Sequence, residues 1–223
     1  MIDTLVLAGL SGTGKSTVGR EVASLLGWTA IDTDDNIQTS TAMSIPEIFE
    51  REGEPGFRAH ERSELTRALD QRRVVIATGG GAVIAEDTWK DDMLRRPGVL
   101  TVTLDAPAEV VLARLAEASA KYGDAVKRPL LDAVDTLQKI RTMKVDRAPA
   151  YARSDVMLPV DGRSIADVAA DLTELVTLAN GGPSSVPLTL PASQSTIEVG
   201  NGSRHQLAIV IRSSWPRAQH VWL

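Results

Sequence analysis

The sequence predicts an α/β fold, in which a parallel β-sheet lies between layers of helices. Short, mostly apolar runs alternate along the chain with segments whose apolar residues recur at helical spacing. Runs of this kind are typical of strands that are covered on both faces of a parallel sheet. Because strands that alternate with helices form βαβ units with right-handed crossovers, we expect a three-layer α/β/α domain.

Five strands are expected, over residues 4–8, 29–31, 74–77, 99–104 and 156–158. The first and the third lead directly into glycine-rich segments, and the second runs into the acidic cluster Asp32–Asp35. In a parallel sheet these segments follow the carboxyl ends of the strands, which is where α/β proteins bind their ligands. We therefore expect a functional site at that edge of the sheet.

Helices are expected over residues 15–26, 55–69, 86–95, 107–118 and 135–150, and from Ser164 onward. Gly27 is placed to end the first helix as a C-cap. Ser44 and Glu47 have the spacing of a capping box, and Ser164 and Asp167 repeat the arrangement at the start of the last helix. Three of the predicted helical segments thus begin or end at a residue that suits the position.

The pattern changes near residue 180. Residues 181–185 are rich in Gly, Pro and Ser, which is typical of a linker. Beyond it, residues 196–199 and 207–211 flank a turn-rich segment and could form a hairpin. We therefore place one domain over residues 1–180 and an extension of unknown role over residues 181–223, either disordered or vestigial.

Composition indicates a globular protein and excludes several classes of function. The hydrophobic content of 43% and the charged content of 24% are ordinary for a globular domain. The absence of cysteine excludes disulfides, thiolate metal sites and a cysteine nucleophile. A net charge of −5 gives no reason to expect nucleic acid, and no apolar run is long enough to span a membrane. With no signal-peptide pattern, we expect a cytoplasmic protein, and a monomer.

Residues Gly9–Thr17 have the pattern G-x-x-x-x-G-K-[ST], between a predicted strand and a predicted helix. Glycines allow backbone N–H groups to converge on phosphate oxygens, and the helix N-terminus adds unpaired N–H groups. Lys15 would reach the β- and γ-phosphates, and the Ser16 hydroxyl would hold Mg²⁺. The motif predicts a nucleoside triphosphate site; the alternative is an accidental glycine-rich turn.

Two carboxylates, Asp32 and Asp34, follow the second strand. Alternation along an extended segment would place both on one side, towards the ligand edge of the sheet. One can serve Mg²⁺ through water, and the other can accept the proton of a substrate hydroxyl. The alternative is a helix cap or a solvated turn.

Arg58 and Glu61 are three residues apart on one helical face, so they can pair and leave the guanidinium available for a carboxylate. Gly79, Gly80 and Gly81 directly follow a buried strand, which indicates a backbone that a ligand approaches closely. For the charged pair alone, a surface contact without function is the alternative.

Two further arginines lie later in the chain. Residues 119–133 have weak periodicity and mixed charge, and we interpret them as a mobile loop that carries Arg128. An arginine on such a lid can neutralise the charge that develops on a transferred phosphoryl group. Arg147 follows in a helix and could bind a second anion. A solvated charge is the alternative for both.

Together these motifs resemble those of the shikimate kinase family, in the same order and over nearly all of residues 1–178. The motifs are Gly9–Thr17, Asp32 with Asp34, Ser44–Phe49, Phe57-Arg58 with Glu61, Gly79–Gly81, Arg128–Leu131, and Arg147 with Tyr151. The resemblance implies the P-loop fold of the nucleoside monophosphate kinases, with a five-stranded parallel sheet and a mobile lid. It also implies Mg²⁺- and ATP-dependent phosphorylation of the shikimate 3-hydroxyl, in chorismate and aromatic amino-acid biosynthesis.

The resemblance also implies a role for each matching residue. Asp34 is the base, Arg58 and Arg147 bind the shikimate carboxylate, and Arg128 closes with the lid onto ATP. Shikimate would contact Asp34, Arg58, Glu61, Gly79, Gly80, Gly81 and Arg147. The nucleotide would contact Ser11, Gly12, Thr13, Gly14, Lys15, Ser16, Thr17, Arg114, Arg128 and Arg163. Ser16, with Asp32 through water, would hold Mg²⁺.

The chain departs from the family pattern in two places. The interval from Arg114 to Arg128 is longer than in the family, and the segment after residue 180 is not part of the pattern. Residues 195–211 faintly resemble the opening strands of 3-dehydroquinate synthase, to which shikimate kinases are fused in some organisms.

Three other functions remain open at this point. A gluconate-type kinase on the same fold would need neither the paired arginines nor the three glycines. A nucleotide-binding regulator without catalysis would be expected to lack Lys15, Asp34 or Arg58. An interaction subunit would dock through Trp215 and Trp222 in the extension.

Overall fold

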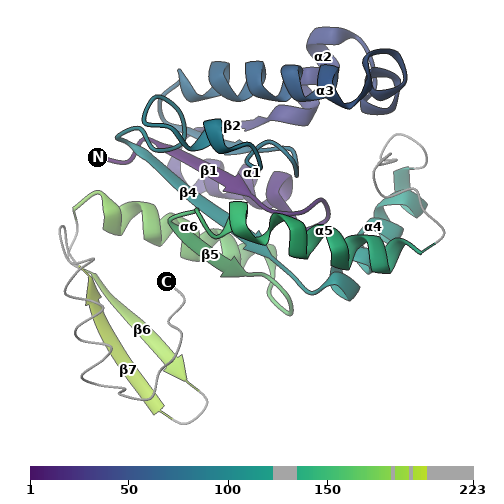
Figure 1. The fold of residues 1–223 in the computed structure, drawn as a ribbon. Coiled ribbons are helices and arrows are strands. Elements are labelled where there is room, and N and C mark those ends of the chain that lie inside the picture. Colours follow the sequence, from purple (N-terminus) through teal and green to yellow (C-terminus); the bar gives the residue numbers. More distant parts are fainter. Residues whose placement is uncertain (123–134, 182–183, 191–192, 200–223) are drawn as a thin grey trace.

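The computed structural model describes residues 1–122, 135–181, 184–190 and 193–199. Five strands form one parallel sheet in the order β2-β3-β1-β4-β5 (Figure 1). The strands are β1 (Thr4–Ala8), β2 (Thr29–Asp32), β3 (Val74–Ala77), β4 (Val99–Asp105) and β5 (Val156–Pro159). This confirms the predicted α/β fold with its five parallel strands.

Helices cover both faces of this sheet. They are α1 (Lys15–Leu26), α2 (Thr33–Thr41), α3 (Ile45–Leu69), the short 3₁₀ helix η1 (Glu86–Trp89), α4 (Ala108–Tyr122), α5 (Thr136–Tyr151) and α6 (Ile165–Ala179). Apolar side chains of α1, α4 and α6 pack in one cluster with Leu5 and Leu7 of β1. A second cluster joins Val6 and Ala8 to α3 and to the segment that follows β3.

Successive apolar side chains of β1 pack alternately into these two clusters, which explains the apolar sequence of the strand. Leu5, Val6 and Leu7 are completely buried, although successive side chains point to opposite faces of the sheet. A strand that is covered on both sides has no position for a polar residue, so its whole run is apolar.

Helix α2 lies where the sequence analysis expects only an acidic cluster. Asp32 is its N-cap, and the carboxylate accepts hydrogen bonds from the backbone N–H groups of Asp34 and Asp35 at 3.0 and 3.3 Å. Only Thr33 and Ile37 of the helix are buried, so the sequence has little helical periodicity to reveal it. Capping and packing against α3 stabilise a helix that apolar spacing does not predict.

The helix predicted over residues 86–95 is wrong beyond its first turn. Only Glu86–Trp89 are helical, as the 3₁₀ helix η1, and turns follow up to the start of β4. Trp89, Met93 and Leu94 are buried in the core cluster beneath β3, and the Trp89 indole N–H donates to the Val83 carbonyl at 2.8 Å. The three residues are apolar because they are buried in the core. Their helix-like spacing in the sequence therefore does not indicate a helix here.

Helix α3 contains both segments that the sequence predicts between residues 44 and 69. The capping box of Ser44 and Glu47 is present. The helix is kinked at Gly53, whose backbone has φ 71° and ψ −177°. The kink separates an N-terminal part from the longer part that begins near Pro55.

After α6, the chain forms an antiparallel hairpin of β6 (Ser184–Leu190) and β7 (Ser193–Val199). The linker predicted over residues 181–185 is therefore wrong from Ser184 onward. Apolar and polar residues alternate through β6, and this pattern outweighs Pro187, which an edge strand tolerates. The predicted partner strand over residues 207–211 lies outside the described residues. The predicted mobile loop over residues 119–133 is wrong at its start, because α4 continues to Tyr122, and the rest of it lies outside the described residues.

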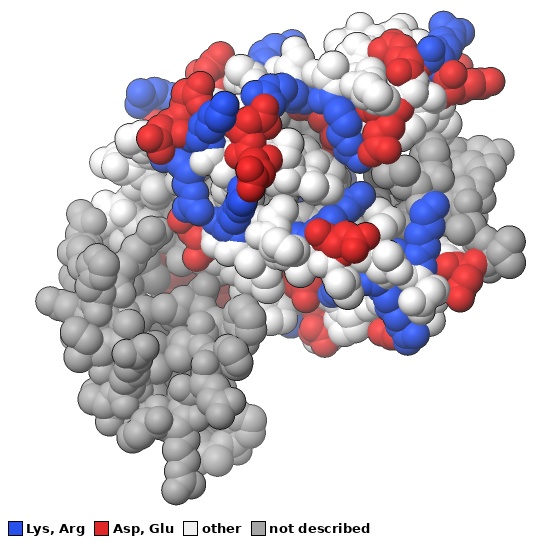
Figure 2. Space-filling model, in the orientation of Figure 1, with Lys and Arg blue, Asp and Glu red and all other residues white. Residues whose placement is uncertain are grey.

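Basic and acidic side chains are interspersed on the face of the molecule that Figure 2 shows, and they do not form a surface of one sign. Several charged side chains of the protein are paired, for example Arg62 with Asp87, and Arg153 with Glu86 at 2.9 Å. Within the described part of the chain, no helix has the length and apolar character that a membrane span requires.

Candidate active site

A cavity of about 560 Å³ lies at the carboxyl ends of the strands, where the sequence predicts the site. Its walls come from the P-loop, the start of α2, α3, the glycine segment after β3, α4, α5, and the connection from β5 to α6. The predicted site residues that line it are Ser11, Gly12, Thr13, Gly14, Lys15, Ser16, Thr17, Asp32, Asp34, Arg58, Glu61, Gly80, Gly81, Arg114, Arg147 and Arg163. Gly79 lies behind this wall, and Arg128 lies outside the described residues.

The P-loop between β1 and α1 has the backbone that its glycines permit. Gly9, Gly12 and Gly14 have φ values of 130°, 88° and 96°, which side chains of L-residues rarely allow. Gly14 caps α1 without a side-chain acceptor, so the first turn of the helix presents its N–H groups to the cavity. The Lys15 ammonium donates to the carbonyls of Gly9 and Leu10 at 2.9 and 3.0 Å.

The two carboxylates reach the cavity by a route other than the predicted one. Asp32 ends β2 and caps α2, whereas Asp34 lies in the first turn of that helix. The expectation of one extended segment is therefore wrong, because the chain becomes helical at Thr33. The junction between strand and helix nevertheless brings both carboxylates to the cavity wall, and the cap and ligand interpretations of Asp32 are compatible.

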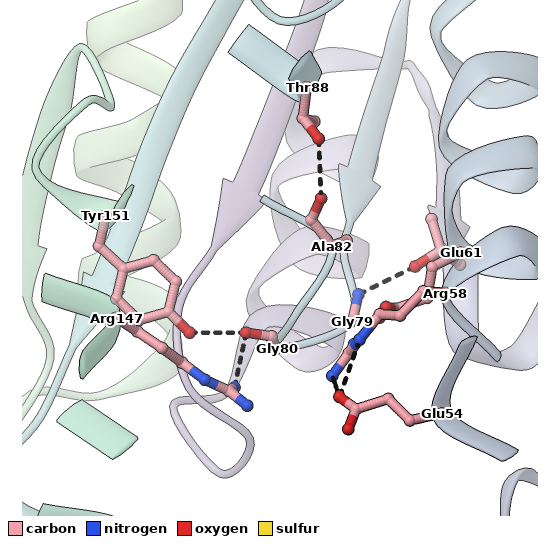
Figure 3. A network of polar contacts seen from close by, with 10 residues as sticks. Glu54, Arg58, Glu61, Gly79, Gly80, Ala82, Thr88, Arg147 and Tyr151 are labelled. Carbon is pink, nitrogen blue, oxygen red and sulfur yellow. Dashed lines mark hydrogen bonds and ion pairs between the residues drawn. The ribbon is translucent and has the colours of Figure 1, made fainter. Parts of the chain in front are cut away.

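Arg58 is held between two carboxylates (Figure 3). Its Nη1 donates to Glu61, while Nε and Nη2 donate to a single oxygen of Glu54 at 3.2 and 2.8 Å. Burial acts to lower the pKa of Arg58, but the two carboxylates outweigh that effect and raise it. The sequence analysis missed Glu54, although its position four residues before Arg58 is the usual spacing of a helical ion pair.

Each of the three glycines after β3 allows a charged side chain to approach the backbone. A Cβ atom on Gly79 would lie 2.2 Å from Oε1 of Glu61 and 2.7 Å from Oδ1 of Asp34. A Cβ atom on Gly81 would lie 2.0 Å from Nη1 of Arg58. Glycine is therefore required at these positions because charged side chains of the protein itself occupy the space that a Cβ atom would need.

The carbonyl of Gly80 accepts two hydrogen bonds from α5. Arg147 Nη1 donates to it at 2.8 Å and the Tyr151 hydroxyl at 2.7 Å (Figure 3). Two residues further on, the carbonyl of Ala82 accepts from Thr88 Oγ1 at 3.4 Å. The glycine segment is thus anchored from both sides of the cavity wall.

Glu61 is the most deeply buried charged residue of the site, with 2% of its surface exposed. Burial raises the pKa of its carboxyl, and the neighbouring Asp34 adds to the rise, so the attraction of Arg58 does not restore the ordinary value. Oε2 accepts from Arg58, whereas Oε1 has no hydrogen-bond partner within the described chain. The wall between Asp34 and Arg58 is therefore polar and closely packed.

On the other side of the P-loop, Arg114 joins two backbone segments. Its guanidinium donates to the Thr13 carbonyl at 3.4 Å and to the Val160 carbonyl at 3.1 Å. Arg163 is held against α6 by Asp171 at 2.5 Å. Both arginines line the cavity, and so do the apolar side chains of Leu115, Met143, Ile165 and Val168. A flat aromatic base fits a wall that combines planar guanidinium groups with apolar side chains.

The described residues contain no cluster of three His, Asp or Glu side chains that would enclose a metal ion. Such a cage is not needed for Mg²⁺, which keeps several waters and binds through one or two protein oxygens and the phosphates of a nucleotide. Ser16 and Asp32 both line the cavity. Both backbone N–H groups that Asp32 caps bond to Oδ1, so Oδ2 takes no part in the cap.

The chain matches a family model for shikimate kinase over residues 11–177. A shikimate kinase of Rhodopseudomonas palustris is 40% identical over 154 residues, which are 69% of this chain and 71% of the relative. One of Symbiobacterium thermophilum is 39% identical over 171 residues, 76% of this chain and 94% of the relative. The solved shikimate kinase from Acinetobacter baumannii in complex with shikimate has a TM-score of 0.70 and 34% identity, with coverage of 79% and 94%.

Proposed function

The chain belongs to the shikimate kinase family and phosphorylates shikimate with ATP, and we propose how its cavity carries out that reaction. The observation that carries the proposal is that one cavity is lined by the P-loop, by a carboxylate at the start of α2 and by two arginines from different helices. A phosphate donor and an anionic acceptor with a reactive hydroxyl can therefore bind side by side.

The acceptor carboxylate is bound by Arg58 and Arg147. Three of the five N–H groups of Arg58 are used by Glu54 and Glu61, which leaves one on each terminal nitrogen for an end-on contact. Arg147 uses one nitrogen for the Gly80 carbonyl and has further donors. Two cations at one end of the site and carboxylates at the other orient a molecule that carries one carboxylate and several hydroxyls.

In the transfer step, the 3-hydroxyl oxygen of shikimate attacks the γ-phosphorus of ATP. The bond from that phosphorus to the oxygen it shares with the β-phosphate breaks, and ADP leaves. Asp34 takes the hydroxyl proton as general base. Lys15 and the N-terminus of α1 offset the charge on the phosphates, because both present N–H donors to the cavity.

Ser16 and Asp32 would hold Mg²⁺, which would neutralise charge on the phosphates of ATP. Arg114 and Arg163 contact the base of ATP. Arg128, outside the described residues, contacts the phosphates in this proposal, as the resemblance to the family implies. We further propose that the enzyme works in the cytoplasm and as a monomer.

A coupled assay of ADP release tests the activity with shikimate, quinate and gluconate, each with and without Mg²⁺. We expect strong stimulation by shikimate in the presence of Mg²⁺ and little by gluconate. The matched control is Asp34→Asn, which should lose about 10²- to 10⁴-fold in turnover while it still binds ATP. ADP release that shikimate does not stimulate would contradict the proposal, and preference for gluconate would favour the alternative kinase.

A further inference from the structure

The Gly80 carbonyl accepts two hydrogen bonds from one helix, and one of the donors has no role in the reaction as described. Arg147 and Tyr151 are four residues apart on α5 and reach the same oxygen at 2.8 and 2.7 Å (Figure 3). Arg147 lines the cavity, whereas Tyr151 does not. Tyr151 can therefore act on the substrate only indirectly, and the Gly80 carbonyl is the group of the cavity wall to which its hydroxyl donates.

The Tyr151 hydroxyl is placed rigidly. Only 6% of the residue is exposed, and its ring packs in the core cluster that also contains Val83 and Trp89. Burial raises the pKa of the phenol above its ordinary value, so the hydroxyl stays protonated and donates at all ordinary pH values. A buried ring of this kind fixes the position of its oxygen, and with it the Gly80 carbonyl.

The direction of this carbonyl determines the direction of the next N–H group. The peptide bond between Gly80 and Gly81 is trans, so the Gly81 N–H points away from the Gly80 oxygen. The oxygen faces α5, so the N–H points away from α5. Arg58 lies beside the same residue, because a Cβ atom on Gly81 would be 2.0 Å from its Nη1. No acceptor for the Gly81 N–H is present in the described part of the chain.

A peptide between two glycines needs such an anchor. Glycine adopts positive and negative φ values with similar ease, so rotation of this peptide plane meets little steric resistance from its own residues. Rotation would turn the carbonyl oxygen towards the acceptor site and would remove an N–H donor from beside Arg58. Two donors on the oxygen oppose this rotation.

We propose that Tyr151 is a positioning residue, which holds the Gly80–Gly81 peptide so that its N–H group and the Arg147 guanidinium together face the carboxylate end of the acceptor. The inference rests on the proposed function, because it assumes an anionic acceptor at Arg58 and Arg147. Tyr151 itself touches neither substrate.

Tyr151→Phe tests this role, since it keeps the ring and removes only the hydroxyl. We expect the KM and the calorimetric Kd for shikimate to rise about five- to tenfold, as for the loss of one hydrogen bond, with the KM for ATP unchanged. Thr103→Val is the matched control. It removes a buried hydroxyl that bonds to the Tyr151 carbonyl at 3.3 Å, at the same end of α5, and contacts no glycine of the site. This variant should lower the melting temperature only.

An unchanged shikimate Kd and KM in Tyr151→Phe would overturn the inference, and so would an equal loss in Thr103→Val. If Tyr151→Phe is much less stable than the control, the ratio of its KM for shikimate to its KM for ATP still tests the inference. This holds because partial unfolding lowers the active fraction and leaves both KM values unchanged. A wild-type enzyme that shikimate does not stimulate would contradict the proposed function instead. The two failures are therefore distinguishable.

Discussion

At the scale of single residues, the acceptor side of the cavity consists of charged groups in contact with glycine backbone. Asp34 and Glu61 meet at Gly79, Arg147 lies against Gly80, and Arg58 lies against Gly81. Charges this close influence one another directly, and burial increases their interaction because little water screens it. The affinity for an anionic substrate therefore depends on the balance of charge around each arginine.

Glu54 shifts this balance against the substrate. It holds Arg58 through Nε and Nη2, and its own side chain is 54% exposed. We predict that Glu54→Gln lowers the KM for shikimate about two- to fivefold, because an incoming carboxylate no longer meets a second negative charge on the same guanidinium. Steady-state kinetics at low ionic strength measure the effect, which should shrink as salt screens it.

The control for this prediction is Glu52→Gln, which lies six residues before Arg58 and on the other side of the Gly53 kink. Glu52 pairs with His60 at 2.9 Å and contacts no arginine of the cavity. It should leave the KM for shikimate unchanged. A KM that rises in Glu54→Gln would show instead that Glu54 mainly orients Arg58 for its substrate.

Glu61 gives the free energy of unfolding a pH dependence of defined sign. Its pKa is raised in the folded state from 4.5 in the unfolded chain. Between pH 4.5 and the raised value, the folded protein therefore binds more protons than the unfolded chain, and the contribution of Glu61 to stability falls as pH rises. We predict that wild type loses stability relative to Glu61→Gln through this window, as measured by denaturant unfolding at several pH values.

Glu47→Gln provides a control with the opposite sign. Hydrogen bonds from Ser44 lower the pKa of Glu47, so its stabilisation is present above pH 4.5 and is lost as pH falls through the lowered value. Parallel curves for wild type and Glu61→Gln would contradict the assignment of a raised pKa to Glu61.

At the scale of helices and strands, the sequence predicts those elements whose signal is local. All five strands of the sheet, the P-loop, the capping box of α3 and the Ser164 cap of α6 depend on apolar runs or on specific short motifs. Helix α2 depends instead on the Asp32 cap and on packing against α3, and the segment after Glu86 depends on burial of Trp89. Contacts between distant parts of the chain decide these two segments, and a single sequence does not display such contacts.

The same distinction applies to the site. The residues that line the cavity follow from motifs, because a motif specifies both the residue type and its place at a strand end. The contacts among those residues do not follow. That Tyr151 reaches the Gly80 carbonyl, 71 residues away in the chain, depends on how α5 lies across the sheet. The D-x-D motif correctly indicates two carboxylates at the site, although the extended backbone assumed for it is wrong.

The kink in α3 gives a prediction at this scale. Gly53 has φ 71° and ψ −177°, a conformation that L-residues rarely adopt. We predict that Gly53→Ala costs about 1–3 kcal/mol of stability and also raises the KM for shikimate. The kink sets the angle between the part of α3 that carries Phe49 and the part that carries Arg58, and both residues line the cavity.

Gly27→Ala is the matched control, because Gly27 also has positive φ, at 64°, but ends α1 away from the acceptor side. Unfolding experiments should show a loss of stability in both variants. Only Gly53→Ala should change the KM for shikimate. If the two variants have the same kinetics as wild type, the kink serves the stability of α3 and not the placement of its site residues.

At the scale of the whole molecule, strand order explains why segments far apart in the chain meet. In the order β2-β3-β1-β4-β5, the P-loop strand β1 is central and β3 lies between it and β2. Ala77 of β3 is in register with Leu7 of β1 and with Asp32 of β2. The P-loop, the glycine segment and the Asp32 carboxylate therefore leave the sheet at the same level, side by side (Figure 1).

We propose a domain boundary after residue 181, which truncation can test. The positions of the cavity, the core and the sheet along the chain support it. The cavity, the hydrophobic core clusters and the five-stranded sheet all lie within residues 1–181. Asn180 closes this unit, because its side chain accepts from the Ile2 N–H and donates to the Ile2 carbonyl at 2.8 Å. These bonds tie the end of α6 to the start of β1.

We predict that a chain of residues 1–181 keeps the turnover, the melting temperature and the oligomeric state of the full chain. Asn180→Ala in the full chain should instead lose about 1–3 kcal/mol of unfolding free energy, since two backbone groups of Ile2 lose their partners. Thr177→Ala, in the same last turn of α6, removes only a bond to the Thr173 carbonyl and should have a smaller effect. Denaturant unfolding and size-exclusion chromatography measure these differences. Loss of activity or a change of oligomeric state on truncation would show that residues 182–223 belong to the working enzyme, and would favour a docking role for the segment that carries Trp215 and Trp222.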